Sequence, residues 1–348
     1  MREGIIPPYV SDKLPEERKN YERARTKELR GMRNVHGFFR PVWTPRTSPF
    51  QIYSAQSKTS LPGRLIREFQ NTPCGDIAVD EVYDSIIALR SLLGDKLGRN
   101  SLNNKGIPIR AVVHYGRDYD NAFWDGREIV FGDGDDGTTV TPKIFHRFTM
   151  DIDITAHELG HGVVQYTSGL IYRGQSGALN EHLADVIGIM AKHLALNIMS
   201  KDSDWLLGSK LFYPEVGARG IRDMLRPGTA FMNSWIGTDP QPDHMSRYMK
   251  MSGDNGGVHY NSGIPNRAFA LSCLAIDTYS WEDIGRIWYK AMCSIPPWCG
   301  FQQFSDKVFE IAKAVSDNCG DAVYSSFSAA GITPKTPKSL WAILFGNK

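Results

Sequence analysis

Two histidines that flank a glutamate could do metal chemistry in this chain. They are His157, Glu158 and His161, in the segment HELGH. In a helix, the two histidines lie one turn apart on one face, and both imidazoles can bind the same ion. Glu158 then lies beside that face, where its carboxylate can accept a proton from a water on the ion. The pattern therefore predicts a zinc site with its own general base.

The residues around HELGH favour the helix that such a site needs. Asp151 and Asp153 precede the motif at the positions of an N-cap and a first-turn acid. Leu159 and Val163 repeat at helical spacing, and Thr-Ser-Gly after Tyr166 is expected to end the helix. We therefore expect a helix that begins near Asp153 and ends just after Tyr166.

A third protein ligand is needed, because catalytic zinc sites combine three protein ligands with one open position. A third histidine at the spacing HExxHxxGxxH is excluded, since the required glycine and histidine are Val164 and Thr167 here. The helical pattern of 177–196 instead places Glu181 and Asp185 against an apolar stripe, where carboxylates are costly without partners. We expect Glu181 to be the third ligand and Asp185 to accept a hydrogen bond from a ligating histidine. A solvated acidic stripe is the alternative.

The composition is ordinary for a globular protein with room for two cores: 348 residues, 41% hydrophobic and 22% charged. A net charge of +2 gives no strong field for nucleic acid or a membrane surface, and no apolar run is long enough to span a membrane. The five cysteines contain no C-x-x-C pair, which argues against a thiolate zinc site. Most should be free thiols, with one bridge among the last four as the alternative.

The chain is predicted to be α+β, with a short N-terminal appendage before its main body. Charge-rich residues 12–33 indicate an exposed helix, and the proline- and serine-rich residues 34–62 indicate a linker. Short β-type runs follow between 107 and 132, whereas helical patterns dominate after residue 176. The predicted motif helix therefore lies between a β-rich half and an α-rich half.

With these residues in view, the chain resembles the thermolysin-like zinc metalloendopeptidases. The resemblance runs from about residue 58 to the end and rests on linked motifs in the family's order: YDNAFWDG (119–126), HELGH (157–161), SGLIY (168–172), NEHLAD (180–185) and DNGGVHYNSG (254–263). It implies a two-domain zincin, with a β-rich catalytic domain over 55–173 that includes the HExxH helix and an α-helical domain over 174–348. It also implies one catalytic zinc on His157, His161 and Glu181.

The resemblance assigns catalytic roles to further side chains. Glu158 would be the general base, which takes a proton from water and later gives it to the leaving amine. Tyr172 and His259 would hydrogen-bond the oxyanion of the tetrahedral intermediate. Asp254 would orient His259 and favour its protonated form.

Substrate contacts are implied in the same way. The residues concerned are Asn121, the backbone of Ala122, Trp124, Ile154, Ile221 and Arg222. The first three would bind the extended substrate backbone, and the arginine would bind the carbonyl just past the scissile bond. The two isoleucines would line the pocket for the next side chain, which predicts cleavage before bulky hydrophobic residues.

The sequence departs from the family at its calcium ligands. Asp153 is kept, but Lys192 stands where an acid is expected. Leu206, Ser209 and Arg219 replace further acidic positions. Because an ammonium near Asp153 could replace the charge of a cation, we expect the paired calcium site to be absent or reduced.

The N-terminal IIPPYV is similar to the protealysin-like subgroup, in which a short segment folds over the catalytic cleft and is cut off. Residues 1–54 are then a propeptide whose anchor is Pro7, Pro8 and Tyr9, with a plain polyproline linker as the alternative. The cut is expected between about 48 and 57, with Phe50 and Ile52 as candidates for the residue after the scissile bond.

These observations predict a zinc-dependent neutral endopeptidase made as a zymogen. Its expected partners are peptide and protein substrates and its own propeptide in the cleft, and it is expected to be a monomer. Since the N-terminus has no hydrophobic signal region, secretion without a cleaved signal peptide is expected, with a cytoplasmic location as the alternative. The other functions considered are a catalytically silent peptide-binding relative, a metallo-aminopeptidase, and an adhesin or toxin in which proteolysis is incidental.

Overall fold

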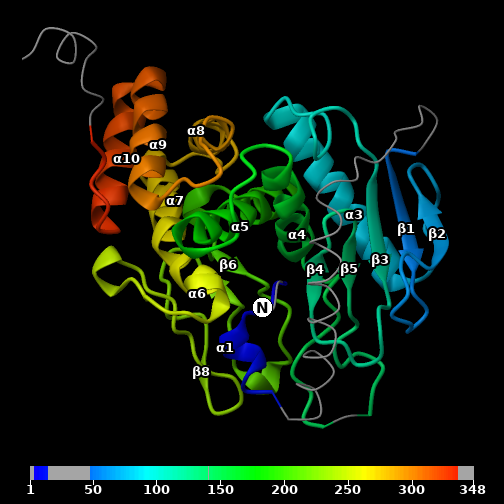
Figure 1. Ribbon diagram of the computed structural model, residues 1–348. Coiled ribbons are helices and arrows are strands. Elements are labelled where there is room, and N and C mark those ends of the chain that lie inside the picture. Colours follow the sequence, from blue (N-terminus) through cyan, green and yellow to red (C-terminus); the bar gives the residue numbers. More distant parts are fainter. Residues whose placement is uncertain (1–3, 15–47, 140, 336–348) are drawn as a thin grey trace, which may run out of the picture.

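The computed structural model describes residues 4–14, 48–139 and 141–335. A half that contains the main sheet and a helical half meet at two helices, α4 (Ile152–Gln165) and α5 (Gly174–Leu196) (Figure 1). This arrangement confirms the predicted α+β class. The predicted motif helix is also confirmed, with an N-cap at Asp151.

The main sheet is mixed and has the strand order β2-β1-β3-β5-β4. Its strands are β1 (Phe50–Ser54), β2 (Arg64–Glu68), β3 (Ile109–Val113), β4 (Ala122–Trp124) and β5 (Ile129–Phe131). Strands β1, β3 and β5 run parallel, while β2 and β4 pair antiparallel with their neighbours. Strand β4 therefore forms an edge of this sheet, where an extended chain can pair with it.

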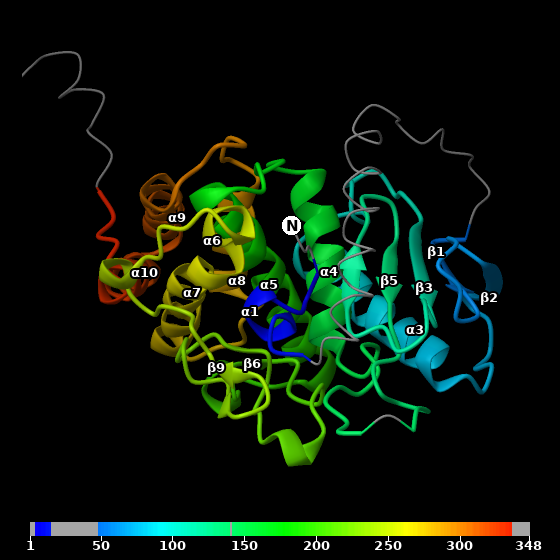
Figure 2. The same cartoon turned by 60° about the horizontal axis from the view of Figure 1, so that its bottom comes forward.

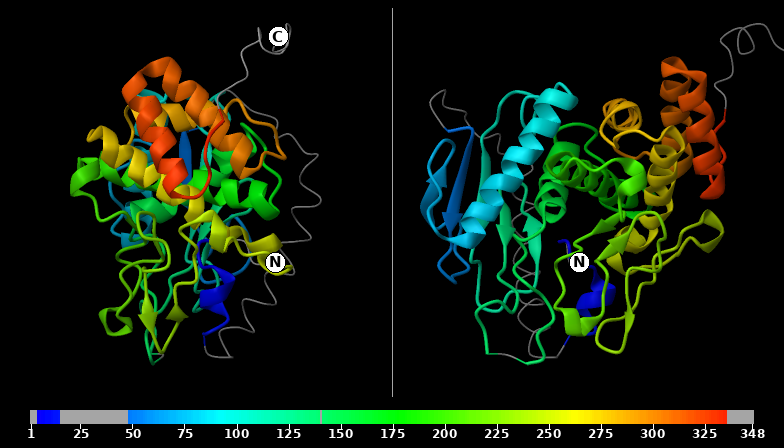
Figure 3. Two further views of the ribbon diagram at one scale, coloured as in Figure 1. Left: turned by 90° about the vertical axis from the view of Figure 1, so that its left-hand side faces the viewer. Right: turned by 180° about the vertical axis from the view of Figure 1, so that it is seen from behind.

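Helices cover one face of this sheet. They are α3 (Ile77–Ser91), which continues into a π-helical turn at Leu92–Lys96, and α4; Figure 3 (right) shows α3 across the back of the strands. The opposite face carries a small separate cluster that includes Val112, Phe123 and Val130. Because neighbouring strand residues point to opposite faces, Ala111, Trp124 and Ile129 belong to the main core instead.

The helical half follows α5. It contains α6 (Asp254–Asn261), α7 (Gly263–Ile276), α8 (Asp283–Met292), α9 (Phe301–Val315) and α10 (Asp317–Ala329). Between α5 and α6 lie the short strands β6 (Leu206–Leu207), β7 (Arg222–Asp223), β8 (Met232–Asn233) and β9 (Gly237–Thr238), and the 3-10 turns Ser200–Asp202, Pro214–Val216 and Met245–Arg247. One buried apolar cluster runs from Ile5 to Ile332, so the two halves share a continuous core.

Small residues let α4 and α5 approach closely. A side chain on Gly160 of α4 would lie 3.0 Å from the Cα of Ala184 in α5. A side chain on Gly188 of α5 would lie 2.7 Å from the carbonyl oxygen of Asp153. The contact at Gly188 excludes a Cβ atom and the contact at Gly160 leaves almost no space for one, so both glycines allow the helices to approach this closely.

The expected linker over 34–62 was wrong for residues 50–54. These form β1, which is hydrogen-bonded on both sides within the sheet, and Phe50 and Ile52 are fully buried. The run FQIYS alternates between buried and half-buried residues as a strand does, but it follows closely on Pro41, Pro45 and Pro49, whose backbone preferences favour a linker. Most of the predicted helix at 12–33 lies outside the described residues.

Two further expectations concern cysteines and membranes. All five cysteines are free, so the alternative of a disulfide among the last four is wrong. Among the described residues, no helix is long and apolar enough to cross a membrane.

Candidate active site

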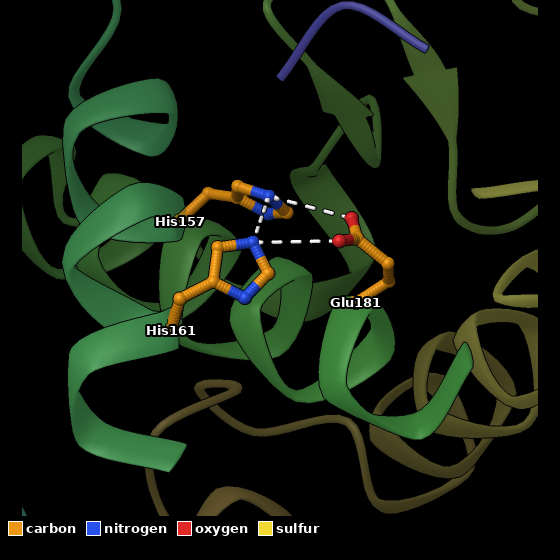
Figure 4. Close-up of side chains that lie close together, drawn as sticks. All are labelled: His157, His161 and Glu181. Carbon is orange, nitrogen blue, oxygen red and sulfur yellow. Dashed lines mark hydrogen bonds and ion pairs between the residues drawn. The ribbon is translucent and has the colours of Figure 1, made fainter. Parts of the chain in front are cut away.

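His157, His161 and Glu181 meet between α4 and α5 (Figure 4). The Nε2 atom of His157 lies 3.2 Å from that of His161 and 3.6 Å from Glu181 Oε2. The distance from His161 Nε2 to Glu181 Oε1 is 3.4 Å. A tetrahedral zinc ion at about 2.0–2.2 Å from such ligands holds them roughly 3.3–3.5 Å apart. The three side chains therefore fit zinc, and the buried Glu181 Oε2 makes no hydrogen bond that would compete.

The charge of this cluster is also suited to a cation. Burial alone would raise the pKa of Glu181, but His259, His161 and His157 around it outweigh burial and lower the pKa to about 2. Glu181 is therefore a carboxylate at neutral pH, although it is only 1% exposed. A buried carboxylate beside two imidazoles is the donor set that zinc prefers in hydrolases.

Asp185 orients His157, the first histidine of the cluster. Its Oδ1 accepts a hydrogen bond from Nδ1 of His157 at 2.7 Å, which leaves Nε2 free to face the cluster. Arg222 donates to the same carboxylate from Nε and Nη2, at 2.9 and 2.7 Å. Burial would raise the pKa of Asp185, but Arg222 and His157 together keep it below its usual range. The predicted position of Asp185 behind a ligating histidine thus agrees with the geometry.

Sequence reasoning missed the residue that orients the second histidine. Asn180 accepts a hydrogen bond from Nδ1 of His161 through Oδ1, at 2.8 Å, and its amide nitrogen donates to the carbonyl of Leu170. Asn180 directly precedes Glu181 in NEHLAD, so its place beside a ligand could have suggested this role.

A longer buried chain of hydrogen bonds was also missed. Asn266 donates to Asp185 Oδ2 at 2.8 Å and accepts from Nδ1 of His182 at 2.7 Å. The indole nitrogen of Trp288 then donates to Nε2 of His182 at 2.9 Å. Each donor in this chain points towards the Asp185 carboxylate. No sequence signal links these residues, because they come from three different helices, α5, α7 and α8.

Glu158 lies beside the ligand cluster, as the motif predicts. Its Oε2 accepts a hydrogen bond from the backbone N–H of Trp124 at 2.8 Å, and the side chain is 1% exposed. Trp124, which we expected to bind substrate, therefore contacts the predicted general base through its backbone N–H. The Trp124 indole donates to Gln165 in α4 at 2.9 Å, which ties β4 to the motif helix.

Tyr172 and His259 both lie beside Glu181. The Tyr172 hydroxyl donates to Glu181 Oε1 and lies 3.3 Å from His259 Nε2. Asp254 accepts from Nδ1 of His259 at 2.6 Å and from its backbone N–H at 2.8 Å. Burial alone would lower the pKa of His259, but Asp254 and Glu181 outweigh burial and raise it to about 9. His259 is thus a cation at neutral pH, whose Nε2–H can donate to an oxyanion.

The two expected pocket residues also lie together. Ile154 of α4 and Ile221, which precedes β7, are both buried. A side chain on Gly208 would lie 3.3 Å from Ile221 and 3.6 Å from Ile154. The two isoleucines therefore face the same glycine.

The N-terminal segment lies against the expected substrate-binding residues. Figures 1 and 2 show α1 (Pro8–Ser11, blue) between the two halves of the molecule. Ahead of it, the backbone N–H of Ile5 donates to the carbonyl of Ala122 in β4 at 3.0 Å, and the N–H of Ile6 donates to Asn121 Oδ1 at 3.0 Å. Nη1 of Arg222 donates to the carbonyl of Ile5 at 3.3 Å.

Tyr9 fixes this segment on the helical half. Its ring packs edge-on against Tyr260 at 4.7 Å and stacks on Phe231 at 6.4 Å, measured between ring centroids. Its hydroxyl is buried without a hydrogen bond. The segment is therefore held at this position by the ring of Tyr9 and not by its hydroxyl.

Comparisons with known proteins agree with this site. A family model described as the thermolysin metallopeptidase catalytic domain matches residues 41–165, and one described as the alpha-helical domain matches 168–332. An extracellular metalloprotease of Pectobacterium carotovorum subsp. carotovorum is 39% identical over 94% of this chain and 96% of its own length. A thermolysin of Bacillus sp. (strain EA1) is 31% identical over 86% of this chain, which spans 54% of that relative.

A solved structure is similar as well. The precursor of protealysin, a metalloproteinase from Serratia proteamaculans, has a TM-score of 0.83 and 36% identity, over 95% of this chain and 99% of that one. The chain therefore belongs to the thermolysin family of metallopeptidases, which are zinc-dependent endopeptidases. Because the similarity to the protealysin precursor covers 95% of this chain and 99% of that one, the chain belongs to the protealysin-like members of that family.

Proposed function

We propose that this protein is a secreted zinc endopeptidase that is made as a zymogen and cuts before bulky hydrophobic residues. The observation that carries the proposal is the contact of Ile5 with Ala122 and Arg222, next to the ligand cluster. A hydrophobic residue of the chain's own N-terminal segment is held there by the groups that we expect to hold substrate.

In the proposed mechanism, His157, His161 and Glu181 hold the zinc. When bound, zinc polarises the scissile carbonyl and lowers the pKa of a water. Glu158 takes up a proton from the attacking water and delivers it to the leaving nitrogen. The hydrogen bond from Trp124 at 2.8 Å keeps the Glu158 carboxylate in place for both transfers.

Charge that develops on the carbonyl oxygen is stabilised by two hydrogen-bond donors. The Nε2–H of His259 and the hydroxyl of Tyr172 are the two donors, and Asp254 keeps His259 protonated. In the structure, the two donors lie 3.3 Å apart and can reach one oxygen between them.

The proposed preference for bulky hydrophobic residues rests on Ile154, Ile221 and Gly208. An apolar, buried wall favours apolar side chains and rejects charge, because a buried charge without a partner is costly. A series of peptides that differ only after the scissile bond tests this preference. We expect Leu, Ile or Phe to be cut at least about 100-fold faster than Asp. Equal rates, or a preference for Asp, would contradict the specificity.

The zymogen proposal concerns residues before the catalytic body. Four side chains of the N-terminal segment, Ile5, Ile6, Val10 and Leu14, are at most 1% exposed, so the segment is an integral part of the folded precursor. The burial of Phe50 and Ile52 in β1 argues against cleavage before either of them and against a domain boundary at residue 54. We therefore propose that the propeptide ends before Ser48, ahead of β1.

A reduced need for calcium is part of the proposal. The ammonium of Lys192 lies 3.2 Å from the buried Asp153 Oδ2 and 2.8 Å from the carbonyl of Leu206. It also lies 3.3 Å from the hydroxyl of Ser209. These oxygens surround Lys192 as they would surround a cation, which supports an internal ammonium in place of the metal.

Secretion is supported by one relative, the protein of Pectobacterium carotovorum subsp. carotovorum, which is named an extracellular metalloprotease. The route without a cleaved signal peptide remains our prediction from the sequence, as does the monomeric state. An aminopeptidase is disfavoured because the hydrogen bonds in the cleft hold Ile5 and Ile6, which are internal residues, and not a free amino terminus. A silent relative is disfavoured by the presence of Glu158, Tyr172 and His259 in one site.

A further inference from the structure

The N-terminal segment lies in the cleft in the register of a substrate. This inference rests on the proposed function, in which Arg222 binds the carbonyl just past the scissile bond. The carbonyl that Arg222 binds is that of Ile5. Ile5 is therefore the residue after the bond that would be cut, and that bond is Gly4–Ile5.

Two further hydrogen bonds agree with this register. The N–H of Ile5, which belongs to the Gly4–Ile5 bond itself, donates to the carbonyl of Ala122 on the edge strand β4. The N–H of the next residue, Ile6, donates to the side chain of Asn121. Each backbone group from the Ile5 nitrogen to the Ile6 nitrogen thus has a partner in the cleft.

The side chain at this position is the kind that the enzyme is proposed to prefer. Ile5 is a bulky hydrophobic residue and is fully buried. The residue before it is the smallest one available. A side chain on Gly4 would lie 2.5 Å from the Ala122 carbonyl oxygen and 2.8 Å from Asn121 Oδ1, so only glycine fits in this pose.

We propose that the protein hydrolyses its own Gly4–Ile5 bond while the rest of the segment stays docked. The oxygen of the attacking water bonds to the carbonyl carbon of Gly4, the C–N bond breaks, and Glu158 delivers the proton to the nitrogen of Ile5. The peptide that ends at Gly4 leaves, and Ile5 becomes the new N-terminus. This cut is separate from the one before β1.

The cut product remains bound for a physical reason. The segment keeps four buried side chains after the cut: Ile5, Ile6, Val10 and Leu14. Tyr9 also stays packed between aromatic rings. These contacts do not depend on the Gly4–Ile5 bond. The new amine also keeps its carbonyl partner on Ala122. We therefore expect slow hydrolysis, and a trimmed segment that still blocks the cleft.

The test follows the N-terminus of the full-length chain, purified with a C-terminal tag and incubated at several concentrations. Intact mass and N-terminal sequencing should show loss of Met1–Gly4, with a first-order rate that does not depend on concentration. Glu158→Gln should keep Met1. Ile5→Asp should slow this cut by about 100-fold or more, because a charge cannot enter the buried position, whereas Ile5→Leu should keep it.

The outcomes separate this inference from the function on which it rests. If the processed protein hydrolyses an added peptide but its released N-terminal fragment still contains an intact Gly4–Ile5 bond, the inference is wrong and the proposed function stands. If Glu158→Gln is trimmed at the parent's rate, another protease makes the cut and the inference is equally wrong. If the parent keeps its Gly4–Ile5 bond and protein from which the N-terminal segment has been removed cuts no added peptide, both are wrong.

Discussion

At the scale of single residues, each proposed zinc ligand is oriented by a hydrogen bond with a second side chain. Asp185 fixes His157 and Asn180 fixes His161, while Glu181 accepts from the Tyr172 hydroxyl. Asp185 is in turn held by Arg222 and Asn266, so its carboxylate has little freedom to rotate. Zinc affinity should therefore depend on residues that never touch the ion.

Replacement of Asn266 tests this dependence. Asn266→Ala removes the donor to Asp185 Oδ2 and the acceptor for His182, and we expect zinc to bind about tenfold more weakly. Zinc affinity is measured on the metal-free, folded protein in zinc-buffered solutions. Ser272→Ala on the same helix is the matched control, because Ser272 is equally buried and, among the described residues, its hydroxyl donates to the carbonyl of Ala268 and not to Asp185. Equal affinities for both variants would contradict the expected role of Asn266.

The sequence predicted the residues of this cluster because helical spacing determines which residues of each helix share a face. HELGH and NEHLAD each lie within one helix, so the positions of His157, His161 and Glu181 could be inferred locally. Asn266 and Trp288 could not, since they reach the site from helices that are distant in sequence. The contact between Trp124 and Glu158 was missed for the same reason.

At the scale of elements, charged side chains join the segments that support the site. His114 follows β3 in a left-handed conformation, with φ 54°. Its Nδ1 bonds to Asp133 after β5 at 2.9 Å, and its Nε2 bonds to Asp76, the N-cap of α3, at 3.0 Å. One imidazole thus connects the sheet to the helix that covers it.

This connection should make stability depend on pH. The hydrogen bond to Asp133 and then that to Asp76 outweigh burial and raise the pKa of His114 to about 9, above the unfolded value of about 6.5. The stabilisation of the folded state by protonated His114 is therefore complete below about pH 6.5, and it is lost as the pH rises through about 9. His114→Asn, which tolerates the left-handed backbone, should cost about 1–2 kcal/mol at pH 6 and much less at pH 10, as measured by urea unfolding. A loss that is equal at both pH values would argue against an ionic connection.

Lys192 makes a second test at this scale. Lys192→Met would leave Asp153 buried without its cation, and we expect a loss of about 3 kcal/mol in the free energy of unfolding. Lys192→Glu would instead bring a carboxylate into the ring of oxygens, and its melting temperature should rise when calcium is added. The parent should melt at the same temperature with and without a calcium-selective chelator. A large fall for the parent in chelator would mean that it holds calcium after all.

Strand β1 shows what the sequence could not reveal about elements. A run of five residues that begins immediately after a proline carries too little periodicity to outweigh its neighbours. Its position in the sheet is set by pairing with β3, more than 50 residues later in the chain. The long helices α4 and α5 were predictable because their apolar stripes repeat over several turns.

At the scale of the whole molecule, the N-terminal segment bridges the sheet and the helical half. Ile5 pairs with the edge strand β4, whereas Tyr9 packs on Phe231 and Tyr260. The segment therefore lies against the residues that we propose to bind peptide substrates. Docking of this segment should control access to the site.

The anchor residue gives the corresponding prediction. Tyr9→Ala removes a buried aromatic ring, and we expect the uncut precursor to hydrolyse an added peptide at least about tenfold faster. Tyr9→Phe is the matched control and should behave like the parent, because the Tyr9 hydroxyl has no hydrogen bond. Rates are measured with a quenched fluorescent peptide before any change in precursor mass. If Tyr9→Ala is as slow as the parent, the ring is not the anchor.

The most direct test of the central claim is a zinc titration of the metal-stripped protein after removal of its N-terminal segment. We expect hydrolysis of a peptide with leucine after the scissile bond to rise in proportion to zinc and to reach its maximum at one zinc per chain. Glu158→Gln should bind the same single zinc and lose about 100-fold or more in kcat. Activity that does not follow zinc, or that survives in Glu158→Gln, would contradict a zinc endopeptidase built on His157, His161, Glu181 and Glu158.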